Sequence, residues 1–254
     1  MKTTIGLALK VIGGLSLLVS LPALAHHSFA AAYDENSPIN KEGVVTKVEL
    51  TNPHSWLWVD VTNEDEWLHA VESTVARFSR LDVLVNNAGF SSKVRSTRHI
   101  GAEEWRSVMD INTLGPAMLT RALLAPMIKK GSGHVVMISS MAAIRPGVMA
   151  GAVYSSAKSA SRAYMDVLAA EVRQHGIRCT TILPGEVDTP ILDNRALPPD
   201  EEARSLMMQP EDISAAVMMA VSLPQRANVL EIAITATAPR DMSKDIEAAL
   251  LRRD

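Results

Sequence analysis

The 254-residue sequence predicts an α/β fold over residues 59–254, in which helices cover both faces of a parallel β-sheet. The first observation is a series of short runs that are apolar throughout, which is typical of strands buried on both faces. The second is that longer segments, with apolar residues three or four positions apart, predict amphipathic helices. The third is that the two patterns alternate along the chain, which indicates parallel strands joined by helical crossovers.

The first 25 residues predict a secretory signal peptide. Lys2 and Lys10 supply positive charge, residues 11–21 are apolar, and Ala23 and Ala25 form an A-x-A cleavage site. The apolar stretch is short for a bilayer crossing, so we expect no stable membrane span. The alternative is an apolar N-terminus that is not cleaved.

Residues 26–58 are expected to form a partial β segment. The runs at 43–50 and 54–61 alternate between apolar and polar residues, and Asn52-Pro53 between them is a turn signal. The pattern predicts a β-hairpin, which is too small to be stable by itself.

From residue 64 onward the alternating elements follow in order. Pro116 and Pro126 should interrupt the second helix, and Gly176 should cap the third. Pro210 opens the fourth helix. The expected helices are 64–79, 103–129, 153–175 and 210–221, and the expected strands are 81–85, 134–139, 177–183 and 229–234.

Composition narrows the class of function. The formal net charge is −3 and no long basic run occurs, which disfavours nucleic acid as a partner. The single cysteine, Cys179, excludes an internal disulfide and a multi-cysteine metal site. It lies in the apolar run 177–183, so we interpret it as a small buried side chain.

Tyr154 and Lys158 are the first candidates for chemistry. They are four positions apart on the helix predicted over 153–175, so the ammonium and the phenol share one helical face. A nearby cation favours the phenolate and lowers the pKa of a tyrosine, which could then exchange a proton with a substrate hydroxyl or carbonyl. Such a pair occurs often by chance, and the alternative is an ordinary exposed Tyr-Lys pair.

Further polar residues follow the predicted strands, where α/β sheets place ligands. Ser140 follows the strand at 134–139, and Pro184-Gly185 follow the strand at 177–183, with Thr189 four residues later. Residues 81–89 read as an apolar strand that runs into a polar turn. Asn112 lies inside a predicted helix, which suggests a local distortion or a water site.

This set of motifs resembles the short-chain dehydrogenase/reductase family. The matching pieces are N-N-A-G (86–89), the helical Asn112, I-S-S (138–140), Y-S-S-A-K (154–158) and P-G-E-V-D-T (184–189). They occur in the order of the family over about residues 59–254. The resemblance implies an N-terminally truncated Rossmann-like domain and an NAD(P)-dependent oxidoreductase. Its substrate would be a small alcohol or carbonyl compound.

The resemblance also implies roles for individual residues. Tyr154 would be the acid/base, and Lys158 would lower its pKa and hold the nicotinamide ribose. Ser140 would polarise the substrate carbonyl, and Asn112 would hold a water in a proton relay. We choose Ser140 because the family usually uses the second serine; for Ser139 the alternative is a buried, hydrogen-bonded hydroxyl.

The cofactor implied is NADP or NAD. Residues 192–208 would be a lid over the substrate pocket, in which Leu197, Met207 and Met208 suggest an apolar substrate or plain packing. The residues expected to bind the cofactor are Asp60, Asn86, Ala88, Gly89, Tyr154, Lys158, Pro184, Gly185 and Thr189.

The chain departs from the family at its N-terminal side. The family begins with a strand and a glycine-rich turn that receives the cofactor pyrophosphate, but no glycine occurs between Gly43 and Gly89. The second strand, which usually selects NAD or NADP, is also missing. We therefore expect weak cofactor binding and reduced turnover. A non-catalytic remnant of the family is the alternative.

Residues 26–62 resemble a small secreted bacterial β-domain family of unknown role. We hypothesise a fusion of the two families near residues 59–62. The first strand of the sheet would then be missing, which exposes the edge of the strand at 81–85. One prediction is that the hairpin over 43–61 covers this edge.

A second class of function is a secreted metal-binding module. His26 and His27, with His54, could offer nitrogen ligands to copper. We expect His134 and His175 to be structural. The signal peptide favours a periplasmic or secreted protein, whereas the cytoplasm would suit the oxidoreductase chemistry. The resemblance further implies a homodimer or homotetramer built on the helices at 103–129 and 153–175.

Overall fold

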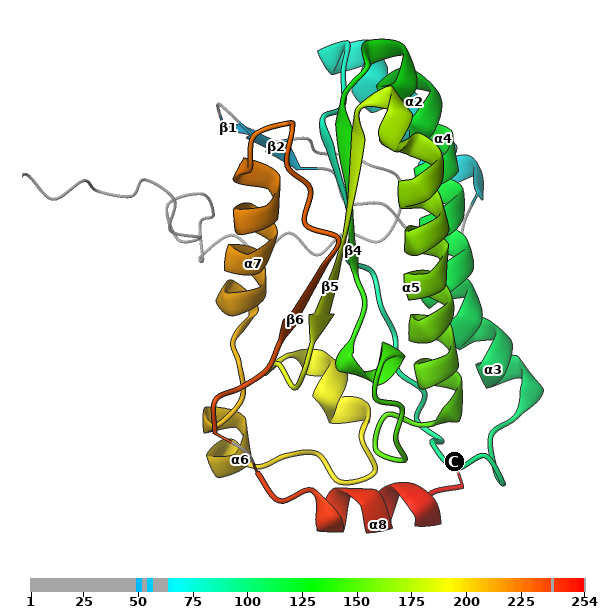
Figure 1. Cartoon of the computed structure of the whole chain (residues 1–254). Helices are drawn as coiled ribbons and strands as arrows, with labels where there is room; N and C mark the ends of the chain where they lie inside the picture. The colour runs from blue at the N-terminus through cyan, green and yellow to red at the C-terminus, as the bar shows by residue number, and fades with distance from the viewer. Residues whose placement is uncertain (1–48, 52–53, 57–63, 239, 254) are drawn as a thin grey trace, which may run out of the picture. The chain divides into compact units, whose positions relative to one another are not determined.

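The computed structural model describes residues 49–51, 54–56, 64–238 and 240–253 (Figure 1). All of them belong to one compact unit of the chain, residues 41–254. The predicted signal peptide, Asp60, His26 and His27 lie outside the described residues.

A four-stranded parallel sheet forms the centre of the unit. Its strand order is β3-β4-β5-β6, and the pairs Val85 with Val136 and Ile182 with Ile232 illustrate the register. The fold class expected from the sequence is thereby confirmed. The strands are β3 (Val83–Asn86), β4 (Gly133–Ile138), β5 (Ile177–Pro184) and β6 (Glu231–Ile234).

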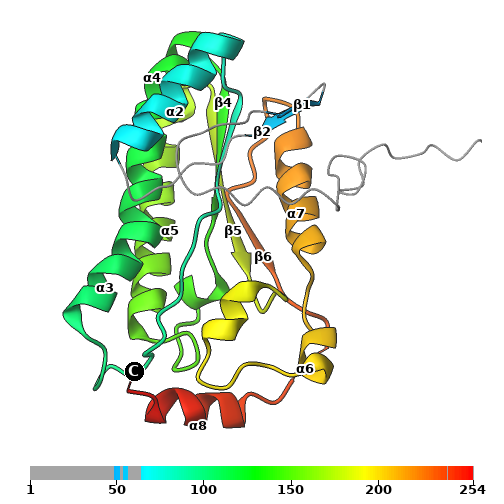
Figure 2. The ribbon, with the colours of Figure 1, turned by 180° about the vertical axis from the view of Figure 1, so that it is seen from behind.

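Helices cover both faces of this sheet (Figures 1 and 2). On one face α2 (Glu64–Phe78), α4 (Gly115–Lys130) and α5 (Ala152–Val172) bury a core that includes Leu123 and Val135. On the other face α7 (Pro210–Ser222) packs its apolar residues against β4 and β5. Because both faces are covered, the strands read as apolar runs in the sequence.

Helix α5 positions the tyrosine and lysine of the candidate site. Val153, Ala157, Met165 and Leu168 are among its buried residues, at the spacing expected for one helical face. A short 3₁₀ turn, η3 (Arg173–His175), follows, and Gly176 ends it with a φ of 71°. A Cβ at Gly176 would lie 2.3 Å from the carbonyl oxygen of Gly131, so glycine is needed there for two reasons.

The long helix expected over 103–129 is divided in two. A π-helical turn, η1 (Asp110–Leu114), separates α3 (Ala102–Met109) from α4 (Gly115–Lys130). The local distortion predicted at Asn112 is therefore present. Pro116 lies in the first turn of α4, where no backbone N–H is required. The interruption expected at Pro126 is wrong, because α4 continues through it with its buried residues packed on the sheet.

The hairpin predicted ahead of the sheet is present in shortened form. Strands β1 (Glu49–Thr51) and β2 (His54–Trp56) pair antiparallel, with Leu50 opposite Ser55, and make a sheet of their own. Among the described strands neither pairs with β3, which is the edge of the parallel sheet. Val83 on β3 is 39% exposed. Hydrogen-bonded pairing of the hairpin with this edge is thus not found.

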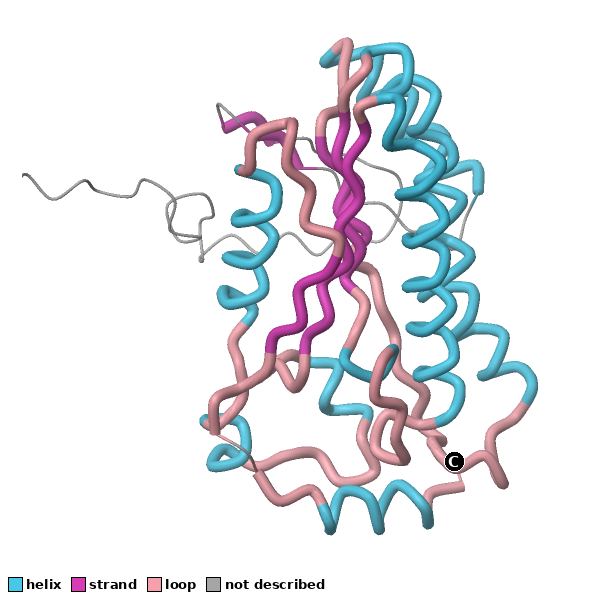
Figure 3. The backbone as a smooth tube through the Cα atoms, viewed as in Figure 1, coloured by secondary structure: helices cyan, strands magenta, loops and turns pink. Residues whose placement is uncertain are grey.

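Loops and short helices gather beyond the carboxyl ends of the strands (Figure 3). They are the 3₁₀ turns η2 (Met141–Ala143) and η4 (Pro190–Asn194) and the helices α6 (Glu201–Ser205) and α8 (Ser243–Leu251). This is the edge at which parallel sheets bind ligands. No helix in the described part has both the length and the apolar character needed to cross a bilayer.

Candidate active site

The candidate residues meet at the carboxyl edge of the sheet. Asn86 ends β3, Ser140 lies two residues beyond β4, and Pro184 ends β5. Tyr154 and Lys158 lie in the first two turns of α5, which packs against η2 and β5 at this edge. The topology thus brings together residues that the sequence separates by almost one hundred positions.

Tyr154, Ser140 and Lys158 form the centre of the site. The Ser140 side chain lies close enough to the Tyr154 hydroxyl to act on its pKa as a hydrogen-bonding neighbour. The Lys158 Nζ lies 5.6 Å from the centroid of the Tyr154 ring, within the range of a cation–π contact. The alternative of an exposed Tyr-Lys pair does not apply, because the Lys158 side chain is buried.

The Tyr154 pKa differs from the sequence-based expectation. Burial raises it, while the hydrogen bond from Ser140 and the positive charges of Arg95 and Arg195 act in the opposite direction. Lys158 was expected to lower this pKa, but its ammonium lies over the ring and donates to the carbonyl oxygen of Ile138 at 3.0 Å. Tyr154 is therefore protonated at neutral pH in this state of the protein.

Lys158 itself has a perturbed pKa. Its side chain is 3% exposed, and burial lowers its pKa to about 8. Desolvation disfavours the charged form of a buried lysine. The ammonium is therefore only partly protonated a little above neutral pH.

The two serines after β4 have different surroundings. The Ser139 hydroxyl donates to the carbonyl oxygen of Lys158 at 3.1 Å and is buried. This agrees with the alternative role given for Ser139, a buried and hydrogen-bonded hydroxyl. Ser140 instead accepts a hydrogen bond from the Ala142 N–H at 3.1 Å, which fixes the start of η2 and leaves its hydroxyl proton to be donated toward Tyr154 or a substrate oxygen. The geometry therefore favours Ser140 as the serine that meets a substrate.

Asn112 joins the π turn to the loop after β3. Its Nδ2 donates to the carbonyl oxygens of Val108 and Phe90, both at 2.8 Å, and its Oδ1 accepts from the Phe90 N–H at 3.3 Å. Thr113 beside it donates to the carbonyl oxygen of Ala157 on α5 at 3.0 Å. The π turn thus ties the loop carrying Gly89 to the helix carrying Tyr154.

Gly89 is where a side chain would crowd the site. A Cβ there would lie 3.3 Å from the Lys158 Nζ and 3.4 Å from the Asn112 Oδ1. Gly89 and its neighbour Ala88 are exposed. Ala88 and Gly89 therefore present mainly backbone atoms to a ligand bound at the end of β3.

Asn86 has one unused hydrogen-bonding atom. Its Nδ2 donates to the Thr120 hydroxyl at 3.0 Å, and that hydroxyl donates to the Pro116 carbonyl oxygen at 2.7 Å. The Asn86 Oδ1 is buried and has no partner among the described residues. A buried acceptor without a donor is costly, which indicates a position that a ligand donor can fill.

The loop after β5 turns away from the sheet at Gly185. The Gly185 N–H donates to the carbonyl oxygen of Ile234 at 2.8 Å, and a Cβ at this position would lie 3.3 Å from the Thr235 Cγ2. Thr189 precedes η4, and its hydroxyl donates to the Val187 carbonyl oxygen at 3.4 Å. Residues 185–189 are half-buried beside the site.

A cluster of arginines and carboxylates lies next to the tyrosine and was not anticipated. Arg195 donates to Glu186 at 2.7 Å and lies 3.8 Å from Asp245, while Arg240 donates to both carboxylates at 2.8–3.0 Å. These ion pairs hold the Glu186 pKa below its usual range despite burial. The network ties the loop after β5 to α8 through two long-range pairs, Glu186 with Arg240 and Arg195 with Asp245, whose members are 54 and 50 residues apart in the sequence.

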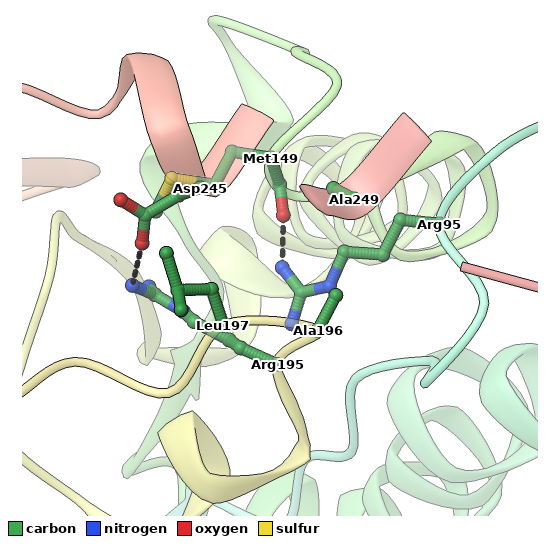
Figure 4. Close-up of a pocket in the computed structure, with 7 residues that line it drawn as sticks. All are labelled: Arg95, Met149, Arg195, Ala196, Leu197, Asp245 and Ala249. Atoms are coloured by element: carbon green, nitrogen blue, oxygen red, sulfur yellow. Dashed lines mark hydrogen bonds and ion pairs between the residues drawn. The ribbon is translucent and has the colours of Figure 1, made fainter. Parts of the chain in front are cut away.

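Arg95 lies beside this network and lines a small pocket (Figure 4). It is 7% exposed, and it donates through Nη1 to the carbonyl oxygen of Met149. Its place in the sequence, six residues after the N-N-A-G turn, is a signal that could have drawn attention to it. The pocket is lined by Arg95, Met149, Arg195, Ala196, Leu197, Asp245 and Ala249.

Histidines do not gather with carboxylates or cysteine in the part of the chain that the structure describes, where no group able to hold a metal ion occurs. His134 is buried, and its Nε2 is hydrogen-bonded to the Thr180 hydroxyl at 2.8 Å. That hydroxyl donates to the Val229 carbonyl oxygen, so Nε2 carries the imidazole proton. Burial and the charge of Arg178 lower the His134 pKa to about 4.

Comparison with known proteins shows the family. The pattern of the family described as short chain dehydrogenase matches residues 29–199. This chain belongs to the short-chain dehydrogenase family. The match includes residues 29–58, so the separate β-domain origin of that segment stays a prediction.

Curated relatives agree with this assignment. The chain is 32% identical to an uncharacterised oxidoreductase of Staphylococcus saprophyticus over 176 residues, which cover 69% of this chain and 72% of the relative. It is 31% identical to a cyclopentanol dehydrogenase of Comamonas over 197 residues, which cover 74% and 78% of the two chains. The chain is therefore a short-chain oxidoreductase by family.

Solved structures show the same fold. The serine dehydrogenase of Escherichia coli is 27% identical, with a TM-score of 0.62 over 72% of this chain and 76% of that one. The closed form of serine dehydrogenase complexed with NADP+ is 28% identical and gives a TM-score of 0.65 over the same shares. A metagenomic short-chain oxidoreductase in complex with NADP is 26% identical, with a TM-score of 0.59 over 71% and 73%.

Proposed function

We propose that this short-chain dehydrogenase interconverts an alcohol and a carbonyl compound, with Tyr154 as the acid and base and NADP or NAD as the cofactor. The observation that carries the proposal is the grouping of three side chains: the Lys158 ammonium lies 5.6 Å from the centroid of the Tyr154 ring, and Ser140 acts on the Tyr154 hydroxyl as a hydrogen-bonding neighbour. Two hydroxyls at the carboxyl edge of the sheet can bind one substrate oxygen and exchange a proton with it.

The proton transfer follows from the pKa of the tyrosine. Because burial raises this pKa, Tyr154 carries its proton at neutral pH and is ready to donate it to a carbonyl oxygen. The Ser140 hydroxyl would donate a second hydrogen bond to the same oxygen as negative charge develops there. A bound reduced nicotinamide supplies the hydride. In the opposite direction the phenolate form of Tyr154 would accept the proton of the alcohol, and because burial raises the Tyr154 pKa this direction should be favoured at high pH.

The residues around the tyrosine fit the nicotinamide end of the cofactor. Asn86 offers a buried oxygen without a partner, and Gly89 leaves no side chain between β3 and Lys158. Lys158 and the exposed backbone of Ala88 and Gly89 would hold this end. Pro184, Gly185 and Thr189 lie on the loop that would cover it. The serine dehydrogenase structure that holds NADP+ supports this assignment.

The chain offers fewer contacts to the pyrophosphate end of the cofactor than to the nicotinamide end. The sequence has no glycine from residue 44 to residue 88, so the close backbone approach that a pyrophosphate needs has no counterpart there. Among the described strands β3 is the edge of the sheet, without a neighbour on that side. These observations favour the second candidate, a family member that keeps the site but binds cofactor too weakly for turnover.

Three further assignments are also proposals. The charged start and apolar run of residues 1–25 support export, so we place the protein in the periplasm or outside the cell. We also keep the hypothesis that a secreted β-domain segment and a dehydrogenase domain are fused near residues 59–62. The family resemblance supports a homodimer or homotetramer, for which Val167 on α5, 67% exposed, offers an apolar contact. Size determination of the purified protein in solution tests the oligomeric state.

Activity of the full chain tests the proposal. Cyclopentanone and cyclopentanol, related to the substrate named for a relative, would be supplied with NADPH or NADP+ and then with NADH or NAD+, while absorbance reports the nicotinamide. We expect slow turnover that Tyr154→Phe removes. Equal rates for the wild type and the variant would refute the assigned role, and binding of cofactor without turnover would favour the non-catalytic candidate.

A further inference from the structure

Positive charge exceeds negative charge around the pocket that Arg95 lines. Three guanidinium groups, those of Arg95, Arg195 and Arg240, adjoin two carboxylates, those of Glu186 and Asp245. Arg195 and Arg240 share the two carboxylates between them. Within the described residues no carboxylate forms an ion pair with Arg95, and Asp245, which acts on it at longer range, is already paired with Arg240.

The Arg95 guanidinium is buried as well as uncompensated. Its side chain is 7% exposed, and its Nε has no hydrogen-bond partner among the described residues. Burial and the nearby charges of Arg195 and Arg252 lower its pKa to about 10. A buried cation without an anion is costly, so a protein keeps one where an anion will bind.

Arg95 also lies next to the start of α5, the helix that carries Tyr154: the Ala152 N–H donates to the Arg95 carbonyl oxygen at 3.4 Å. The Arg95 charge acts on the Tyr154 hydroxyl, and the pocket lies between the loop after β3, the loop after η4 and helix α8 (Figure 4). Figure 4 shows the Arg95 guanidinium directed into the pocket, with one terminal nitrogen toward the Met149 carbonyl oxygen and the other toward Ala196. An anion bound there would lie near the start of α5, two residues from which Tyr154 presents its hydroxyl.

Of the three apolar residues expected to shape the substrate, two lie outside the pocket. Met207 and Met208 are 7% and 6% exposed and belong to the packed interior, and neither lines the pocket. Leu197 lines the pocket but is 43% exposed. The polar character of the pocket thus depends mainly on its arginines.

We propose that the substrate carries a carboxylate, which Arg95 binds while Tyr154 and Ser140 hold the hydroxyl or carbonyl oxygen of the same molecule. The substrate class is then a short hydroxy acid and its oxo acid, and this inference rests on the proposed function. A guanidinium binds a carboxylate through two parallel hydrogen bonds, which also sets the orientation of the substrate. Arg195, already paired with Glu186, contributes less.

The experiment compares acids with their methyl esters on the full chain. The probes are 2-, 3- and 4-hydroxybutyrate and the three corresponding methyl esters, which keep the hydroxyl and lose the charge. In the wild type we expect kcat/KM for the best acid to exceed that of its ester by about 10- to 100-fold, the range of a charge-assisted hydrogen bond. Arg95→Gln should reduce this ratio to near one, and Arg95→Lys should restore part of it.

A matched control separates binding from stability. Arg178 is another arginine whose Nε is buried without a partner, and it donates to the carbonyl oxygens of Ala220 and Leu223, away from the pocket. Arg178→Gln should lower thermal stability and leave the acid-to-ester ratio unchanged. If Arg95 only stabilises the loop that carries Met149, Arg95→Gln will also lower thermal stability and leave the acid-to-ester ratio unchanged. That result would refute the proposal.

Calorimetric titration distinguishes this inference from the proposed function. Binding of the acid by the wild type, lost in Arg95→Gln, supports the carboxylate site even if no probe is turned over, in which case only the proposed function fails. Turnover of acids and esters at equal kcat/KM overturns the carboxylate site and leaves the proposed function intact. If the wild type neither binds nor prefers the acids, the carboxylate site is refuted directly.

Discussion

Two regions of the parallel sheet differ in how many of the residues typical of the family they hold in place: the region of β4, β5 and α5, and the edge formed by β3. Around β4, β5 and α5, buried side chains and hydrogen bonds fix Tyr154, Ser140 and Lys158 within one small region. Around β3 the described sheet ends, Val83 is 39% exposed, and the Asn86 Oδ1 has no partner. The proton-transfer site is therefore preorganised, whereas the cofactor side depends on the few residues at the end of β3.

This difference teaches that the two halves of a dehydrogenase site rest on separate parts of the fold. The catalytic residues are held by α5 and the adjoining strand ends, and every contact named for them lies after residue 85. The pyrophosphate end of a dinucleotide site rests on the first βα turn, which precedes these elements in the family. A chain can keep the first set of contacts intact while the second is weak.

The largest expected effect is on the catalytic side. Tyr154→Phe removes the hydroxyl that exchanges the proton, and we expect turnover to fall by about 10²–10⁴-fold, the usual contribution of general acid–base catalysis. The phenyl ring keeps the contact with Lys158, so cofactor affinity should not change. Steady-state rates and cofactor titration measure the two quantities. Wild-type rates in Tyr154→Phe would show that the residues held around β4, β5 and α5 do not carry out the proton transfer.

The neighbouring serines give a matched pair of variants. Ser140→Ala should reduce turnover by about 10²-fold with little loss of stability, because it removes one donor to the substrate oxygen. Ser139→Ala should lower the free energy of unfolding by about 1 kcal/mol, because it removes a buried hydrogen bond to α5, and leave turnover nearly unchanged. The opposite pattern would assign the catalytic role to Ser139.

Lys158 should make stability depend on pH. Its pKa is about 8 in the folded protein and 10.5 without burial, so between these values the unfolded chain binds more protons and stability rises with pH. Lys158→Met should therefore be more stable than the wild type at pH 7, by about 1–3 kcal/mol at roughly 1.4 kcal/mol per pKa unit. The advantage should vanish as pH approaches 10.5. Denaturant unfolding at both pH values measures it.

The smallest expected effect concerns the cofactor side. If the pyrophosphate and adenine ends make few contacts, reduced nicotinamide mononucleotide should bind within about threefold of NADH, a difference below 1 kcal/mol. Both affinities should be much weaker than micromolar. Fluorescence titration of the reduced nicotinamide measures each ligand. A micromolar affinity for NADH, with much weaker binding of the mononucleotide, would show that residues ahead of β3 bind the pyrophosphate and adenine ends of the cofactor.

The sequence predicted the parallel sheet, the long helix and the central residues because each has a local signature. Residues four apart on a helix and apolar runs that end in polar turns are visible without a structure. The arginine network was not predictable, because Arg195, Arg240 and Asp245 meet only when α8 folds back over the sheet edge. The Tyr154 pKa was predicted in the wrong direction, since burial outweighs a cation whose position over the ring depends on packing.

The π turn at residues 110–114 carries a consequence for the whole of α4. Such a turn has one residue more than the equivalent α-helical turn, so it acts as a single-residue insertion and offsets the faces of α3 and α4 by about 100°. Deleting one residue there would let the helix run regularly. It would also swing every later side chain of α4 around its axis, so that the face now buried against the sheet would turn toward water.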